Sequence, residues 1–175
     1  MIKIKKFLKN NYDIWDSFVL EANNGTLFHL RKFLSYHPED RFKDHSIEIY
    51  KKNTLLSVFP AADLIINDKK MLISHPGSSY GSFVSKKELS IKDAMDMVSK
   101  LIDYSIKKGF DGIQLTIPPG FHSNRASNYI EYSLLVNGFD YLRRDVTSIL
   151  TIESSEDEIL NKFKPSHQRA LRKSK

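Results

Sequence analysis

The sequence has 175 residues, of which 41% are hydrophobic and 27% charged, with a formal net charge of +6. This globular composition supports one core and excludes two complete domains of that size. The absence of cysteine excludes disulfides, thiol nucleophiles and cysteine-bound metals, and no apolar run is long enough for a membrane span or a secretory signal, which is typical of a cytosolic protein.

Hydrophobic periodicity and turn signals predict an alternation of helices and strands. In chain order we expect a strand at 2–5, helices at 12–23 and 30–36, strands at 46–50, 54–66 and 71–74, a long helix between Ser90 and Gly109, a strand at 110–117, a helix at 128–136, an extended stretch at 139–152, and helices starting at 156 and 165.

The order β-α-α-β-β-β-α-β-α-β, followed by two further helices, predicts an α/β protein of the α+β type. We expect a mixed, largely antiparallel sheet flanked by helices on both faces, rather than a doubly wound nucleotide-binding fold. In that sheet the strands around Ile47, Leu56 and Ile73 should lie side by side with the strand of Ile113.

The positive charge is confined to the C-terminal end of the sequence. Residues 1–161 contain 21 of the 27 lysines and arginines and all 21 acidic residues. The excess lies on Lys162, Lys164, Arg169, Arg172, Lys173 and Lys175. Such a tail favours the phosphates of a coenzyme, a nucleotide-linked substrate or tRNA. The alternative is a solvated helix face whose acidic partners lie beyond Lys175.

The most unusual segment is the loop that follows the strand at 71–74 and lies between two expected strands. It reads Ser74-His75-Pro76-Gly77-Ser78-Ser79-Tyr80-Gly81-Ser82-Phe83. Its glycines and serines can present backbone N–H groups and hydroxyls to a phosphate or carboxylate. A wide turn with polar filler is the alternative. The segment lacks P-loop spacing, and a strand rather than a helix is expected after Ser79, which argues against a nucleophile elbow.

Two further features are candidates for ligand contact. None of the six histidines has the spacing of a metal site, and His75 is the one best placed to act as a base or a hydrogen-bond donor. Arg31 and Lys32 open a short helix among aromatic residues, where they can clamp an anionic substrate. An amphipathic face with snorkelling side chains is the alternative for that pair.

Three segments together resemble the Fem-type transferases, which are non-ribosomal aminoacyl and acyl transferases built from two domains of the GNAT N-acyltransferase fold. These segments are Trp15–Arg31, Ser74–Gly81 and Arg169–Ser174. The element order is also similar to that fold. The resemblance implies that residues 1–144 form the first GNAT-like domain and that residues 145–175 form the opening strand and helices of a second, truncated one, so that the fragment itself is inactive.

The resemblance also implies a function. Family members transfer an amino acid from aminoacyl-tRNA, or an acyl group from acyl-CoA, to an amine on a nucleotide- or lipid-linked cell-wall or surface-polysaccharide precursor, in the cytoplasm or at the inner face of the membrane. The residues expected to bind the acceptor are Arg31, Lys32, His75, Ser78, Ser79 and Tyr80. Those expected to bind the donor are Arg169, Arg172 and Lys173. No position matches a motif that identifies a catalytic residue.

One departure from the wider fold family limits the donor. GNAT enzymes that bind acetyl-CoA directly carry a Gln/Arg-x-x-Gly-x-Gly/Ala loop at a helix N-terminus for the pyrophosphate. No Gly-x-Gly occurs in this sequence. We therefore expect the first domain to bind no coenzyme A, which makes a self-contained acetyltransferase the weakest interpretation. The second hypothesis is a non-catalytic GNAT-like module that binds a phosphate-bearing partner through its basic tail, with a steep salt dependence.

Overall fold

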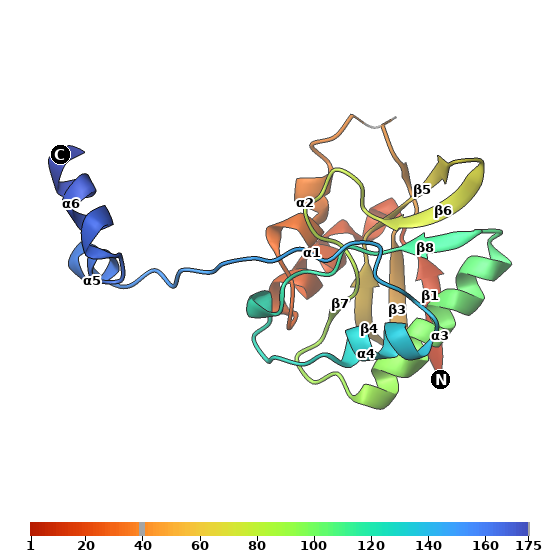
Figure 1. Cartoon of the computed structure of the whole chain (residues 1–175). Helices are drawn as coiled ribbons and strands as arrows, with labels where there is room; N and C mark the ends of the chain where they lie inside the picture. The colour runs from red at the N-terminus through yellow and green to blue at the C-terminus, as the bar shows by residue number, and fades with distance from the viewer. Residues whose placement is uncertain (39–40, 175) are drawn as a thin grey trace. The chain divides into compact units, whose positions relative to one another are not determined.

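The structure is a computed structural model that describes residues 1–38 and 41–174 (Figure 1). The tail cation Lys175 lies outside the described residues. The chain divides into two compact units, Met1–Asp140 and Tyr141–Lys175, called here the first and the second unit. No described helix is both long enough and apolar enough to cross a membrane.

The first unit contains eight strands within the described residues. In chain order its elements are β1 (Ile2–Lys6), η1 (Lys9–Asn11), α1 (Tyr12–Glu21), η2 (Leu27–His29), α2 (Arg31–Leu34), β2 (Lys43–Asp44), β3 (Ile47–Lys51), β4 (Thr54–Phe59), β5 (Ala61–Ile66), β6 (Lys69–Ser74), β7 (Val84–Ser85), α3 (Ile91–Lys107), β8 (Gly112–Gln114), η3 (Gly120–His122) and α4 (Tyr129–Val136). The second unit contains α5 (Glu156–Asn161) and α6 (Pro165–Ser174).

These strands form two four-stranded sheets. The first has the order β1-β3-β4-β7 and is antiparallel throughout. The second has the order β2-β5-β6-β8, in which only the β6–β8 pair is parallel. The prediction of a mixed, largely antiparallel α+β fold is therefore confirmed.

The expectation of a single sheet is wrong in that form. Ile47 and Leu56 lie in the first sheet, whereas Ile73 and Ile113 lie in the second. The predicted strand at 54–66 is divided at Pro60, because proline has no N–H to donate to a ladder. The two sheets are nevertheless connected through the same two segments of the chain. The segment of β2 and β3 pairs with the segment of β4 and β5, as β3–β4 in the first sheet and as β2–β5 in the second.

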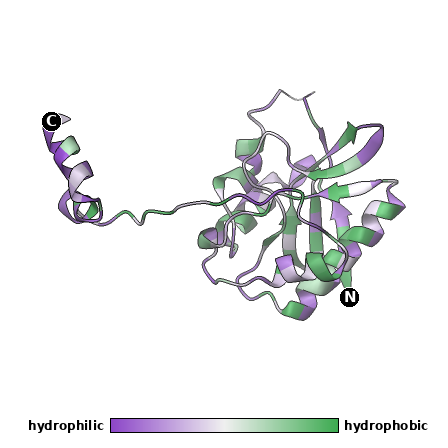
Figure 2. Ribbon diagram, viewed as in Figure 1, coloured by the Kyte–Doolittle hydropathy of each residue, from purple (hydrophilic) through white to green (hydrophobic). Residues whose placement is uncertain are grey.

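Helices cover both faces of the first sheet. On one face the α3 side chains Met97, Val98 and Leu101 pack with Ile47 and Ile49 of β3 in one hydrophobic core. A second core on the other side contains the side chains Trp15, Val19, Val58 and Val84. Figure 2 shows hydrophobic residues concentrated on the central strands of the first unit. Full burial of side chains of this size stabilises the fold by roughly 1.5–3 kcal/mol each.

The boundaries of α3 follow the predicted signals. The Ser90 hydroxyl accepts a hydrogen bond from the backbone N–H of Asp93 at 3.1 Å, which caps the first turn. Gly109, just past the last turn, has φ of +71°, a left-handed conformation that glycine adopts without strain. Local chemistry alone therefore determines where this helix begins and ends.

The extended stretch predicted at 139–152 does not form a strand among the described residues. A strand requires a neighbour for its backbone hydrogen bonds, and β-branched content alone does not supply one. That residues 145–175 open a second GNAT-like domain stays a prediction.

Candidate ligand-binding site

The loop singled out from the sequence lies where the two sheets meet. Ser74, at the end of β6, pairs with Ala61, and Val84 of β7 then pairs with Val58. Residues 75–83 therefore start beside Ala61, the first residue of β5, and return beside Val58, near the end of β4. The junction places this polar loop next to both sheets.

A buried histidine that the sequence analysis did not select holds this loop in place. The backbone N–H of Thr26 donates to His29 Nδ1 at 3.0 Å, so the ring proton sits on Nε2 and is donated to the Gly81 carbonyl at 2.9 Å. Burial lowers the pKa of His29, against the opposing effect of the Gly81 hydrogen bond. The neutral imidazole therefore acts as a fixed clamp on the loop.

Gly81 is required by close packing. A Cβ added at this position would lie 2.4 Å from the Cβ of Ser74. The Gly81 N–H donates to the Thr116 carbonyl at 2.9 Å, and the Thr116 N–H donates to Ser74 Oγ at 2.8 Å. The loop backbone therefore fills the space beside the ends of β6 and β8.

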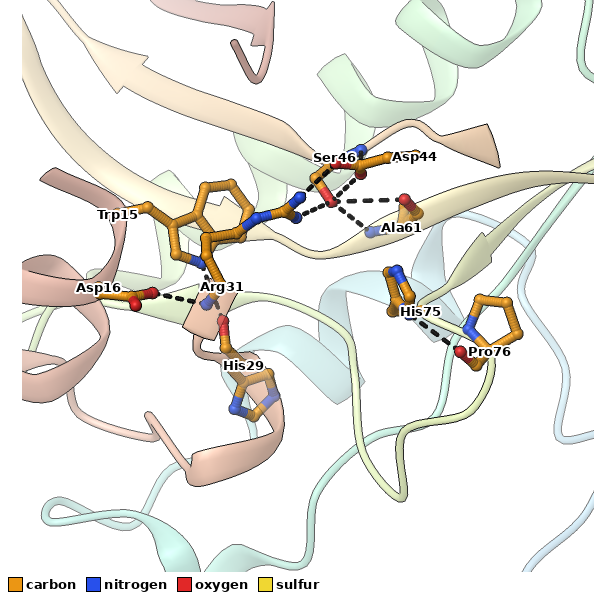
Figure 3. A network of polar contacts seen from close by, with 9 residues as sticks. All are labelled: Trp15, Asp16, His29, Arg31, Asp44, Ser46, Ala61, His75 and Pro76. Atoms are coloured by element: carbon orange, nitrogen blue, oxygen red, sulfur yellow. Dashed lines mark hydrogen bonds and ion pairs between the residues drawn. The ribbon is translucent and has the colours of Figure 1, made fainter. Parts of the chain in front are cut away.

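Arg31, predicted to contact the substrate, is instead a buried internal cation (Figure 3). Its guanidinium forms an ion pair with Asp44 and donates from Nη1 to Ser46 Oγ at 2.8 Å. The same group lies over the ring of Phe7 at 4.4 Å and over that of Trp15 at 5.3 Å. These contacts engage the guanidinium with the protein, except for Nε, which has no hydrogen-bond partner among the described residues. Arg31 is buried, so it does not face an anionic ligand.

Asp44 shows the electrostatic effect of this network. Burial raises the pKa of its carboxyl, but the Arg31 charge and the hydrogen bonds from Ser46 outweigh that effect, so the pKa is lowered overall. Ser46 also accepts the N–H of Ala61 at 3.1 Å, which ties the network to the start of β5. The buried charges are thus paired and hydrogen-bonded, as buried charges must be.

Lys32, unlike its neighbour Arg31, is exposed to solvent. The backbone N–H groups of Arg31 and Lys32 donate to the two carboxylate oxygens of Asp16 at 2.6 and 3.2 Å. The structure therefore separates the two predicted cations into one internal and one external residue, and they do not form a joint clamp.

His75 lies at the start of the loop and is 5% exposed. Its Nδ1 lies 2.9 Å from the Pro76 carbonyl, which can only accept, so Nδ1 carries the proton and Nε2 keeps a lone pair. The ring packs against His37 and Phe42 at centroid distances of 6.1 and 5.4 Å. Burial is the main cause that lowers the pKa of His75, which keeps the ring neutral.

The remaining loop residues have different environments. Ser78 Oγ lies within hydrogen-bond distance of the carbonyls of Phe28 (3.1 Å) and Tyr80 (2.9 Å), so it supports the loop from within. The Tyr80 ring packs edge-on against Phe28 at 5.4 Å and lies 5.3 Å from the His122 ring. Ser79 is exposed. The structure therefore presents Ser79 and part of Tyr80 to a ligand, beside segment 27–36.

A cavity of about 140 Å³ lies next to the loop, within the first unit. Its lining residues lie within three segments of the chain, 23–24, 82–89 and 117–131. The Asn23 side chain exchanges two hydrogen bonds with the backbone of Arg125, at 2.9 and 2.7 Å. The Asn24 side chain likewise bonds the carbonyl of Phe83 at 2.7 Å and the N–H of Ser85 at 2.9 Å.

These two asparagines hold the cavity walls together, although neither was among the candidate site residues taken from the sequence. Their partners lie about sixty and about one hundred residues away in the sequence. An Asn-Asn-Gly run after a helix was the available signal, but it does not identify partners at that separation.

The residues around this cavity do not fit an acyl-CoA. Pockets for drug-sized ligands start at about 300 Å³, and this cavity has about half that volume. The N-terminus of α3, the helix that follows the loop, already has its own acid: Asp93 accepts from Lys51 Nζ at 2.8 Å. A carboxylate there opposes a pyrophosphate, so we derive no step that involves coenzyme A in the first unit.

The predicted donor residues lie on α6 in the second unit. Arg169, Arg172 and Lys173 are all exposed and lie on one side of the helix by their spacing. Their interaction with a donor stays a prediction.

No protein-family model matches the sequence, and no curated protein matches it. Several solved structures do match its fold. A ribosomal-protein-alanine N-acetyltransferase from Brucella melitensis biovar Abortus 2308 is 9% identical, with a TM-score of 0.55 over 86% of this chain and 99% of that one. A GNAT family acetyltransferase from Staphylococcus aureus is 12% identical, with a TM-score of 0.50 over 85% and 98%.

A third match is AAC(6')-Iy in complex with the bisubstrate analogue CoA-S-monomethyl-acetylneamine. It is 10% identical, with a TM-score of 0.51 over 87% of this chain and 99% of that one. At such identities the likeness establishes the fold alone. The chain has the GNAT fold, which confirms that part of the prediction, whereas none of the three names refers to a Fem-type transferase.

Proposed function

We propose that this chain serves N-acyl transfer, in which an acyl or aminoacyl group moves from an activated ester or thioester to an amine. The observation that carries the proposal is the GNAT fold, shared with proteins named as N-acetyltransferases. In this reaction the amine nitrogen forms a bond to the carbonyl carbon, the bond to the leaving oxygen or sulfur breaks, and the amine loses a proton. Such a reaction needs a proton acceptor and donors for the developing oxyanion.

In this proposal the first unit recognises the acceptor. Lys32 supplies an exposed positive charge, Ser79 an exposed hydroxyl, and Tyr80 a partly exposed ring. His75 and Ser78 support that surface from beneath, and the Nε2 lone pair of His75 is available to accept a proton or a hydrogen bond. Arg31 keeps the surface in place through Asp44 and Ser46 rather than contacting the acceptor.

The finer proposal is the Fem-type role. The acceptor would be an amine on a nucleotide- or lipid-linked cell-wall or surface-polysaccharide precursor, and the donor an acyl-CoA or an aminoacyl-tRNA. The 140 Å³ cavity described above is too small for coenzyme A, so the proposal assigns donor contact to the basic face of α6. Arg169, Arg172 and Lys173 would meet phosphates there by charge.

The test is a transfer assay with the purified chain, radiolabelled acetyl-CoA or charged tRNA as donor, and an amino-sugar nucleotide as acceptor. We expect labelled acceptor with one donor class, and a several-fold higher acceptor KM when Lys32 and Ser79 are both replaced by alanine. Lys69→Ala, at an exposed hairpin tip, is the matched control and should leave KM unchanged. Absence of transfer from both donors contradicts the proposal.

A non-catalytic module remains the second candidate, favoured by the exposed basic face of α6. It predicts binding to a polyanion that weakens steeply with salt and is lost when Arg169, Arg172 and Lys173 are replaced by alanine. Binding that does not change with salt contradicts this alternative.

A further inference from the structure

A buried, uncharged histidine holds each end of the polar loop at residues 75–81. At the C-terminal end, His29 is fully buried and donates its ring proton to the Gly81 carbonyl at 2.9 Å. Its other ring nitrogen, Nδ1, accepts the backbone N–H of Thr26 at 3.0 Å. A proton added to Nδ1 would face that N–H donor, so this arrangement fits only the neutral ring.

At the N-terminal end of the loop, His75 packs against a second buried histidine, His37. The two rings are nearly parallel, with an interplanar angle of 14° and a centroid distance of 6.1 Å. The loop backbone lies close to the same ring, since a Cβ at Gly77 would be 2.6 Å from His37 Cε1 and Nε2. His37 Nε2 has no hydrogen-bond partner among the described residues, so this ring holds the loop by packing.

Protonation of His75 would add positive charge to a buried site that already has cations nearby. The ring is 5% exposed, and the positive charge of Arg31 acts on it. Arg41 Nη1 lies 3.4 Å from His37 Nδ1, so the neighbouring ring also has a cation beside it. Asp44 favours the charged form of His75, but its carboxylate is already paired with Arg31. Burial is the largest effect, and the pKa of His75 is lowered overall.

His29 responds to acid in the same direction. Burial is the largest cause that lowers its pKa, and the nearby His122 lowers it further, against the opposing effect of the Gly81 hydrogen bond. The His122 ring itself packs against Tyr80 of the loop, at 5.3 Å. Both buried rings therefore take up a proton less readily than the ordinary value of 6.5 allows. The closed loop is then fully stable above that pH and loses stability as the pH falls below it.

We propose that residues 75–81 form an acid-released loop, which is closed while His29 and His75 are neutral and opens when they take up protons from the solvent. The proton on His29 Nδ1 ends its hydrogen bond from Thr26, and the proton on His75 Nε2 charges the ring stacked on His37. Opening exposes both rings to water, which hydrates their charged forms. The inference concerns the loop itself and does not rest on acyl transfer.

The experiment is a titration of the ¹⁵N-labelled full chain from about pH 7.5 to about pH 4.5, which spans and passes below the ordinary histidine range. Amide hydrogen exchange and the histidine ring shifts are followed together. We expect the protection factor of the Gly81 amide, which donates to the Thr116 carbonyl, to fall about tenfold or more. The fall should be reversible, should leave the far-UV circular dichroism unchanged, and should share its midpoint with the ring titrations of His29 and His75.

The double variant His29→Gln with His75→Asn separates these protons from other effects of acid. Glutamine places an amide donor near the position of His29 Nε2, asparagine places one near that of His75 Nδ1, and neither titrates. The Gly81 protection factor should then be independent of pH. His45→Gln is the matched control, because His45 is also buried but contacts Tyr104 and Phe110. It should leave the midpoint of release unchanged.

Two outcomes overturn the inference. The first is titration of the His29 and His75 rings in the unsubstituted chain without loss of Gly81 protection. The second is loop release that persists with the same midpoint in the double variant, or that His45→Gln abolishes. If the double variant opens the loop at every pH, the comparison of ring and amide midpoints in the unsubstituted chain decides the matter.

Discussion

Two polar regions of the first unit contain the same chemical groups, an arginine and a serine, in opposite states. In the Arg31 network the buried guanidinium, the Asp44 carboxylate and the Ser46 hydroxyl are joined to one another. In the cavity, the buried hydroxyl of Ser82 has no partner among the described residues. The first region uses polar groups to stabilise the fold, whereas the second leaves a buried hydroxyl without a hydrogen bond.

The contrast follows from the cost of desolvation. A buried polar group without a partner costs roughly 1–3 kcal/mol, so native structures rarely leave one. Where the protein supplies most partners, as around Arg31, whose Nε alone lacks one among the described residues, substitution should lower stability. Where the partner is missing, as for the Ser82 hydroxyl, removal of the group should leave stability unchanged or raise it. The predictions below test the stabilising side of this comparison, from the largest effect to the smallest.

Arg31→Ala should lower the free energy of unfolding by about 2–4 kcal/mol, because it leaves Asp44 and Ser46 without their cation and removes the contact with the Phe7 ring. The expected loss is below that of a fully buried pair because the Asp44 side chain is 37% exposed. Urea denaturation monitored by Trp15 fluorescence measures it. Lys32→Ala, next in the sequence but exposed, should change stability by less than about 0.5 kcal/mol; equal losses would remove the distinction between the two cations.

Gly81→Ala should cost about 1–3 kcal/mol, because the new Cβ meets Ser74 at 2.4 Å and forces the loop away from Thr116. Faster hydrogen exchange at the Gly81 and Thr116 amides should accompany the loss. Gly120→Ala is the matched control, since a Cβ there meets nothing within 4 Å. A variant at position 81 as stable as the control would show that the loop tolerates movement.

Asn24→Ala should cost about 1–2 kcal/mol, because the carbonyl of Phe83 and the N–H of Ser85 both lose their partner. The same urea titration measures the change, and the cavity-wall amides should show new chemical shifts. Unchanged shifts at Ser82 and Ser85 would mean that the asparagine does not position the wall.

The pH dependence of stability should report on His45. Burial, with a smaller contribution from Lys6, lowers the pKa of His45 from 6.5 to about 4. The unfolded chain therefore binds a proton that the folded chain does not between these values, so stability falls as pH drops from about 6.5 towards 4. We expect His45 to account for about 1–2 kcal/mol of that fall. His45→Gln should flatten the curve in this window, and an unchanged slope would assign the loss to other groups.

Elements with local signals were predicted well. Ser90 and Gly109 marked both ends of α3, because capping and a left-handed residue are properties of a few adjacent residues. The hairpin of β3 and β4 followed from alternation and a turn. The sequence predicted one continuous strand at 54–66 although it contains Pro60. The strand divides there because β4 pairs with β3 and β5 pairs with β2, and the sequence does not identify these partners.

The candidate site was predicted less well. The sequence drew attention to residues 74–83, and the structure does place them at the junction of the two sheets. Arg31 and Lys32 were indistinguishable as neighbours in the sequence, since burial is decided by the elements packed around them. His29, Asn23 and Asn24 were missed as site-forming residues because their partners are distant in the sequence.

The sequence by itself determined the α+β class, the order of most elements and the ends of α3, because periodicity, capping and turns act over a few residues. Only the tertiary structure decided that the strands divide into two sheets, that Arg31 is internal while Lys32 faces solvent, and that the buried Ser82 hydroxyl has no partner among the described residues. The physical reason is that burial and hydrogen-bond satisfaction depend on residues brought together from distant parts of the chain, which no local pattern records.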